Sequence, residues 1–77
     1  MIDIGKKIKE LRKFKGLTQQ EMADLININS AIYGYTNEKV SRVSITRYEN
    51  GSRIPSCYIV YLISKTLDIS VSEFFKE

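Results

Sequence analysis

The strongest indication of the fold comes from the stretch Ser41-Arg42-Val43-Ser44-Ile45-Thr46-Arg47-Tyr48-Glu49-Asn50-Gly51. Serine is a favourable N-cap residue and Asn-Gly is a usual helix ending, so the stretch predicts a helix that begins after Ser41 and ends at residues 50–51. At about 100° per residue, Ser44, Ile45 and Tyr48 share one face. We expect that face to pack in a core and the opposite, polar and basic face to be exposed.

Two helices are predicted before this stretch. An amphipathic helix is indicated by apolar residues that recur at spacings of four and three: Ile4, Ile8 and Leu11. Asp3 is a candidate N-cap for it, and Gly16 is a natural left-handed ending. Thr18-Gln19-Gln20-Glu21 has the form of a capping box, in which a hydroxyl and an acid three residues later bond free backbone amides. It predicts a second helix over about residues 19–26.

Residues 27–39 are the least regular part of the chain, because Asn, Ser and Gly alternate there with Ile and Tyr. We expect an ordered but irregular connection, with a short hairpin or a helical turn. Apolar side chains in and just before this segment are expected to pack the connection onto the edge of the domain: Leu25, Ile28, Ile32, Tyr33 and Tyr35.

The remaining sequence predicts two more helices. Pro55-Ser56 opens the fourth, whose expected core stripe is Cys57, Val60, Ile63, Ser64 and Leu67. Ser70-Val71-Ser72-Glu73 is a second capping box and starts a short helix with Phe74 and Phe75. The fold class expected from these patterns is all-α, with five helices.

Length and composition limit the function classes. The 77 residues are expected to form a single domain over 1–77, and their formal charge of +3 is compatible with a polyanionic partner. No apolar run is long enough to span a bilayer, so no membrane partner is expected. The one cysteine excludes an internal disulfide and fits a reducing cytoplasm.

Chemistry at a catalytic centre is not expected. The chain has no histidine and one cysteine, which removes the usual zinc sites and the Ser-His and Cys-His nucleophile systems. The carboxylates are dispersed along the chain, and no glycine-rich loop is present to hold phosphates. We therefore expect no metal, no cofactor and no enzymatic activity.

Several motifs, in the right order, closely resemble the phage-repressor-like helix-turn-helix family, which is also called the Cro/C1 or XRE type. These motifs span Leu17–Ala23, Val40–Gly51, Arg53–Ser56 and Leu67–Phe75. The resemblance covers nearly the whole chain except residues 27–39. It implies a lambda-repressor-like DNA-binding domain with an enlarged connection between helices two and three. The implied function is a sequence-specific, double-stranded-DNA-binding transcriptional regulator that acts as a repressor.

The resemblance makes the third helix the recognition helix. A major groove about 12 Å wide accepts one helix, arginine grips guanine bidentately, and a threonine or valine surface meets a thymine methyl group. The expected base-reading residues are Arg42, Val43, Thr46 and Arg47. The expected phosphate contacts lie at the second helix's N-terminus, at the third helix's cap and in the turn that follows: Thr18, Gln19, Ser41, Asn50, Ser52 and Arg53.

The same resemblance implies a structural pair. Arg12 on the first helix and Glu49 on the third match a family pair that forms a partly buried salt bridge. Glu49 projects nearer to the core face than to the groove, so we expect it to bind Arg12 rather than DNA.

Residues 27–39 depart from the family pattern, which has a tight turn there. Loop entropy does not forbid the longer connection, since each doubling of loop length costs only about 0.6 kcal/mol. Two interpretations stay open: a tyrosine hydroxyl of this segment reaches a DNA phosphate, or the segment packs away from DNA.

A homodimer is expected to bind a palindromic operator. Ile59 and Leu62 lie off the predicted core stripe and, with Tyr58, Tyr61 and Phe75, are expected to form an exposed patch that a second copy covers. The expected location is cytoplasmic, at the nucleoid. The alternatives are an antitoxin with a protein partner, a restriction–modification controller, and a helical protein-interaction module that does not bind DNA.

Overall fold

The computed structural model describes residues 3–32 and 39–76. In these ranges the chain forms four α-helices and a 3₁₀ helix, with no strand: α1 (Ile4–Phe14), α2 (Gln19–Ile32), α3 (Arg42–Asn50), α4 (Cys57–Leu67) and η1 (Val71–Phe75). The all-α prediction is confirmed. The fifth predicted element is present as a 3₁₀ helix of five residues.

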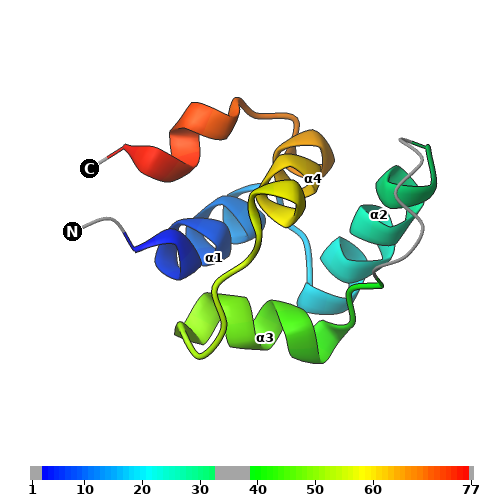
Figure 1. The fold of residues 1–77 in the computed structure, drawn as a ribbon, viewed down its shortest axis with the longest axis horizontal. Helices are drawn as coiled ribbons and strands as arrows, with labels where there is room; N and C mark the ends of the chain where they lie inside the picture. The colour runs from blue at the N-terminus through cyan, green and yellow to red at the C-terminus, as the bar shows by residue number, and fades with distance from the viewer. Residues whose placement is uncertain (1–2, 33–38, 77) are drawn as a thin grey trace.

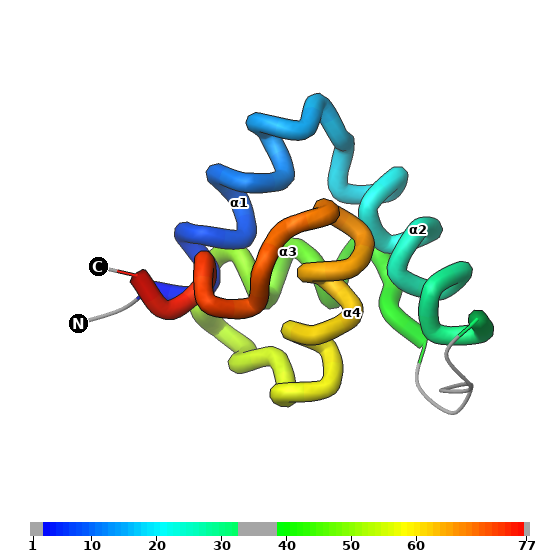
Figure 2. The backbone as a smooth tube through the Cα atoms, turned by 90° about the horizontal axis from the view of Figure 1, so that it is seen from above, coloured from blue at the N-terminus to red at the C-terminus, as the bar shows by residue number. Residues whose placement is uncertain are grey.

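The helix α3 lies along one edge of the molecule, and the other helices lie to one side of it (Figure 1). It packs against both α1 and α2, and α4 in turn packs against α2 and η1. The view from above shows α4 in front of α3, between α1 and α2 (Figure 2). The core between the helices is made of fully buried side chains that include Ile8, Met22, Ile26, Ile45, Leu62, Ile63 and Phe74. This packing leaves one long face of α3 outside the core.

The helix ends follow the local signals in the sequence. Asp3 accepts a hydrogen bond from the backbone N–H of Lys6 and caps α1. The Ser41 side chain accepts from the N–H of Ser44 at 3.2 Å, and the Ser44 hydroxyl accepts from the N–H of Ser41, which is a complete capping box. Gly51 ends α3 in the left-handed conformation at φ 80°. These caps begin and end α3 where the sequence predicted.

The predicted end of the second helix at Ile26 is wrong, because α2 continues to Ile32. The expected irregular connection over 27–39 is therefore helical in its first part, and residues 33–38 lie outside the described ranges. Ile28 and Ile32 are 55% and 69% exposed, so they do not pack onto the domain edge as expected. The two expectations for Tyr33 and Tyr35, packing and a phosphate contact, fall on undescribed residues.

Asn27 joins the extended α2 to the start of α3. Its side-chain amide donates to the carbonyl of Val40 at 2.8 Å, and its side-chain oxygen accepts from the N–H of Val40 at 2.9 Å. Val40 is 3% exposed and immediately precedes the N-cap Ser41. One side chain thus satisfies both backbone groups of a buried residue, and it fixes where the chain enters α3.

We predict that Asn27→Ala lowers the free energy of unfolding by about 1–3 kcal/mol, since the polar backbone groups of Val40 lose their partners. Asn27→Asp is the matched comparison, because it keeps the acceptor for the N–H of Val40 but sets a carboxylate oxygen against the Val40 carbonyl, so it should destabilise the protein at least as much as Asn27→Ala. Urea unfolding followed by circular dichroism measures both. An Asn27→Ala midpoint equal to that of the wild type would contradict the role assigned to this amide.

The predicted stripe on α4 is partly wrong. Val60, Ile63, Ser64 and Leu67 are buried as expected, but Ile59 and Leu62 are 0% exposed as well. The reason is that α4 is covered on more than one side, by α2 and by η1, so its buried surface is wider than one stripe.

The predicted exposed patch on α4 is therefore not formed. With Ile59 and Leu62 inside, Phe75 is exposed, whereas Tyr58 and Tyr61 are half-buried against the core. Cys57, expected in the core, is exposed at the start of α4.

Candidate nucleic-acid interface

The exposed face of α3 carries the four side chains that the sequence predicted to read bases. Arg42 and Arg47 are exposed, Val43 is 51% exposed, and Thr46 is half-buried. The opposite face is buried through Ile45 and through Tyr48, the latter 3% exposed as expected. One short helix therefore presents two guanidinium groups and a small apolar surface while its other side is held by the core.

A buried ion pair fixes α3 to α1. The Nε of Arg12 donates to Oε2 of Glu49 at 2.6 Å and its Nη2 donates to Oε1 at 3.1 Å, a bidentate geometry. The two side chains are only 9% and 4% exposed. The hydrogen bond to Glu49 is the main influence that raises the pKa of Arg12 above its ordinary value. The pair lies where the sequence placed it, and Glu49 faces α1 rather than the exposed side.

Arg12 also reaches the turn before α2. Its Nη1 donates to the carbonyl of Leu17 at 2.7 Å. Leu17 precedes Thr18, so the guanidinium that holds α3 also holds the start of α2. One side chain therefore contributes to the placement of both helices.

Gln19 occupies a place that sequence reasoning did not foresee. It was expected to contact a phosphate, but its Nε2 donates to Oε1 of Glu49 at 3.1 Å and its Oε1 accepts from the Thr46 hydroxyl at 3.0 Å. The half-buried Gln19 thus links the ion pair to a predicted base-reading residue. No spacing pattern in the sequence signals this contact, because its partners are remote along the chain.

Gly5 is a second residue whose role sequence reasoning missed. It is buried in α1, and a Cβ atom there would overlap the backbone carbonyl of Tyr48 in α3. Only a residue without a side chain allows the two helix backbones to approach this closely. A glycine inside an otherwise apolar-periodic helix was the available signal.

The N-terminus of α2 has the predicted capping box. The Thr18 hydroxyl accepts from the N–H of Glu21 at 3.0 Å, and Oε1 of Glu21 accepts from the N–H of Thr18 at 2.9 Å. The hydrogen bond from the Thr18 backbone is the main cause that lowers the pKa of Glu21 below its ordinary value. Because the carboxylate uses that N–H, a phosphate at this end would bind through the Thr18 hydroxyl proton and the other amides of the first turn.

The turn after α3 is held by its own side chains. The side-chain oxygen of Asn50 accepts from the N–H of Ser52 at 2.9 Å and from its hydroxyl at 2.7 Å. The N–H of Arg53 donates to the carbonyl of Arg47 at 3.2 Å. All three predicted phosphate contacts in this turn are exposed, and the turn is ordered by hydrogen bonds of its own.

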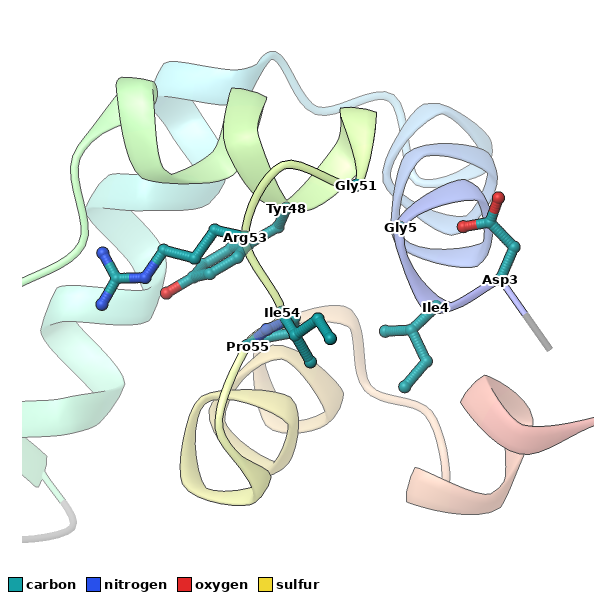
Figure 3. A pocket seen from close by; sticks show the side chains of 8 residues that line it. All are labelled: Asp3, Ile4, Gly5, Tyr48, Gly51, Arg53, Ile54 and Pro55. Atoms are coloured by element: carbon teal, nitrogen blue, oxygen red, sulfur yellow. The ribbon is translucent and has the colours of Figure 1, made fainter.

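A cleft opens beside this turn, between the start of α1 and the segment that joins α3 to α4. It is lined by Asp3, Ile4, Gly5, Tyr48, Gly51, Arg53, Ile54 and Pro55. Figure 3 shows Ile4 and Ile54 facing one another across it, while the Arg53 side chain runs along the Tyr48 ring. The guanidinium carbon of Arg53 lies 6.0 Å from the centre of that ring, which steadies an exposed cation at the end of α3.

Over residues 3–32 and 39–76, no three His, Cys, Asp or Glu side chains are grouped to hold a metal ion. In the same ranges, no helix combines the length and the apolar character needed to cross a bilayer.

The chain is similar in sequence to several known proteins. Over 74 residues the chain is 35% identical to "Antitoxin PezA" of Streptococcus pneumoniae and 34% identical to the "Competence pilus inhibition repressor" of Acinetobacter baylyi, each alignment covering 96% of the chain. It is 38% identical over 69 residues, 90% of the chain, to the "Uncharacterized HTH-type transcriptional regulator YqaE" of Bacillus subtilis.

The chain spans 39%, 56% and 49% of the length of these three relatives, in that order. A family model described as "Helix-turn-helix domain" matches residues 5–77, which includes every helix apart from the first residue of α1. The match agrees with the resemblance seen in the sequence motifs. The chain therefore belongs to the helix-turn-helix domain family, of the XRE type.

Proposed function

We propose that this protein is a sequence-specific, double-stranded-DNA-binding transcriptional regulator that inserts α3 into the major groove. The observation that carries the proposal is the exposed face of α3, with Arg42 and Arg47 on a helix whose other side is fixed by a buried ion pair. At 1.5 Å per residue, the nine residues of α3 span roughly 14 Å, a length suited to a short stretch of groove.

Phosphate contacts on both sides of α3 would orient it. Thr18 and the backbone N–H of Gln19 lie at the start of α2, Ser41 caps α3, Asn50 ends α3, and Ser52 and Arg53 lie in the turn that follows. These groups supply hydroxyl, amide and guanidinium donors, which bind phosphate oxygens without reading sequence. Regulation by such a protein is exerted on the chromosome, so we place it in the cytoplasm, at the nucleoid.

Selection of bound duplexes from a random pool tests the proposal. We expect one enriched motif, and we expect Arg42→Ala and Arg47→Ala each to weaken binding to it by about tenfold or more, since a bidentate contact to guanine is worth about 1–3 kcal/mol. The matched controls are Lys65→Ala and Lys76→Ala, each of which also removes one positive charge, but from α4 and from the C-terminal end instead of α3.

The selection is repeated at two salt concentrations. A steep salt dependence with no enriched motif would reveal binding to the DNA backbone alone and would contradict sequence-specific recognition. Full DNA binding by the Arg42→Ala/Arg47→Ala double variant would assign DNA binding to another surface and contradict the role proposed for α3.

We also propose that the protein binds a palindromic operator as a homodimer. Two recognition helices related by a twofold axis must lie about 34 Å apart to enter successive major grooves on one side of DNA. The domain measures 32 × 23 × 23 Å, a size compatible with two copies side by side at that spacing. Sedimentation of the protein with an enriched duplex should give two chains per duplex, and a one-to-one complex would contradict the dimer.

A second candidate is an antitoxin that also binds DNA, because one relative at 35% identity carries that name. In that case a partner protein would bind this chain outside the DNA-contacting face. Co-expression with the product of the neighbouring gene distinguishes the two functions: growth arrest by the neighbour alone, relieved by this chain, supports the antitoxin.

A further inference from the structure

Four polar side chains form a continuous chain of hydrogen bonds that runs from α1 to the exposed side of α3. Arg12 binds Glu49, Glu49 accepts from Gln19, and Gln19 accepts from the Thr46 hydroxyl. We propose that Gln19 is a positioning residue for base recognition. It holds the Thr46 hydroxyl toward the protein, so that Thr46 offers DNA its methyl group and selects a thymine. The proposal rests on the proposed function.

The orientation of the Gln19 amide follows from the chemistry of its neighbours. The Glu49 carboxylate is bound by Arg12 and accepts hydrogen bonds only, so the amide nitrogen of Gln19 must face it. The amide oxygen is then directed to the other side, where Thr46 lies 3.0 Å away. That oxygen is an acceptor and requires the hydroxyl proton. The buried ion pair therefore determines the direction of a hydrogen bond at the surface.

The Thr46 hydroxyl is fully committed as a donor. Its one proton is shared between the amide oxygen of Gln19 and the backbone carbonyl of Arg42, at 3.0 and 3.1 Å. It is thus unable to donate to the acceptors that guanine and thymine present in the major groove. With the hydroxyl turned to α2, the methyl group is the part of Thr46 left for an apolar contact with a base.

Val43 supports the contact proposed for the Thr46 methyl group. Val43 is 51% exposed and stands three residues before Thr46, so the two are adjacent on the helix surface. A Thr46 methyl directed outward would extend the apolar surface of Val43 between the two exposed arginines. That combination suits a sequence with thymine methyl groups flanked by guanines.

Deoxyuridine substitution tests the proposal, because it removes only the methyl group of a thymine. Each thymine of the enriched duplex is replaced in turn. At one thymine per half-site, uracil should weaken wild-type binding about fourfold, the effect of one methyl group removed from a buried contact. Thr46→Ser keeps the hydroxyl and lacks the methyl group. The loss of affinity caused by uracil (the uracil penalty) should therefore disappear at that thymine and remain at any other thymine where the wild type shows one.

Gln19→Met tests whether Gln19 acts by positioning Thr46 or by contacting the DNA itself. Methionine has a similar length but no amide, so the Thr46 hydroxyl loses one of the two acceptors that orient it and keeps only the carbonyl of Arg42. The loss of affinity caused by uracil at the same thymine should therefore become smaller than in the wild type. Gln20→Met is the matched control, since Gln20 is exposed and bonds only to Asp24 within α2. It should keep the full penalty. Thermal unfolding checks that all three variants are folded.

Two outcomes would overturn the inference. If Gln19→Met weakens thymine and uracil duplexes by the same factor, Gln19 acts as a backbone contact or as a purely structural residue. If no thymine shows a uracil penalty that depends on Thr46, its methyl group reads no base. Failure of the proposed function has a different signature, since no motif would then be enriched and the arginine substitutions would have no effect.

Discussion

Arg12→Met is expected to lower the free energy of unfolding by about 3–5 kcal/mol, because it leaves the carboxylate of Glu49 buried without its cation. The Glu49 side chain is 4% exposed, and only the amide of Gln19 would remain to bind it. The turn at Leu17 would lose a hydrogen bond as well. Denaturant unfolding measures the change, and a thermal scan should show a large drop in Tm.

A second variant separates the buried charge from the rest of the pair. Arg12→Met combined with Glu49→Leu removes both charges, and such replacements by apolar residues are often neutral or stabilising. We expect the double variant to recover much of the stability that Arg12→Met loses. An unchanged unfolding midpoint for Arg12→Met alone would show that the pair does not hold α1 to α3.

Gly5→Ala is expected to destabilise the protein by about 1–3 kcal/mol or more, which is the usual cost of forcing extra atoms into a packed interior. Helix propensity alone predicts the opposite sign, since alanine in a helix is favoured over glycine by up to about 1 kcal/mol. The clash decides the sign, because the new Cβ would meet the carbonyl of Tyr48 and the backbone of Glu49 rather than a flexible side chain.

Gly16→Ala is the control for this substitution. Gly16 has a φ of 74° and no atom within 4 Å of an added Cβ, so alanine there costs only the left-handed conformation, about 1–2 kcal/mol. Gly5 lies in a right-handed helix, and any loss there arises from the contact with α3. Stabilisation by Gly5→Ala in chemical unfolding would show that α1 and α3 are able to separate at no cost.

Gly5→Ala and Arg12→Met should also affect the DNA-binding interface. Gly5 and Arg12 both set the position of α3 against α1, so destabilised variants should lose DNA affinity at temperatures near their melting point. At low temperature, where Arg12→Met is still folded, weaker binding to an enriched duplex would report displacement of α3 rather than unfolding.

The helix starts and ends were predictable because their signals are local. A cap is formed by a side chain and an amide two or three residues away, as at Ser41 and Thr18, so the sequence contains both partners side by side. Several predictions that depended on wider packing failed. The second helix was expected to end at Ile26, and Ile59 and Leu62 were expected outside, because a single amphipathic stripe was assumed for α4.

The candidate site divides in the same way. The exposed face of α3, with Arg42 and Arg47, was predictable from helical periodicity alone. The partners of Gln19 and Asn27 were not predictable in this way, since each binds residues that packing brings together from distant parts of the chain. The same holds for Gly5, whose need for a missing side chain arises from another helix. Local geometry is encoded in neighbouring residues, whereas burial and side-chain pairing depend on how all the helices pack.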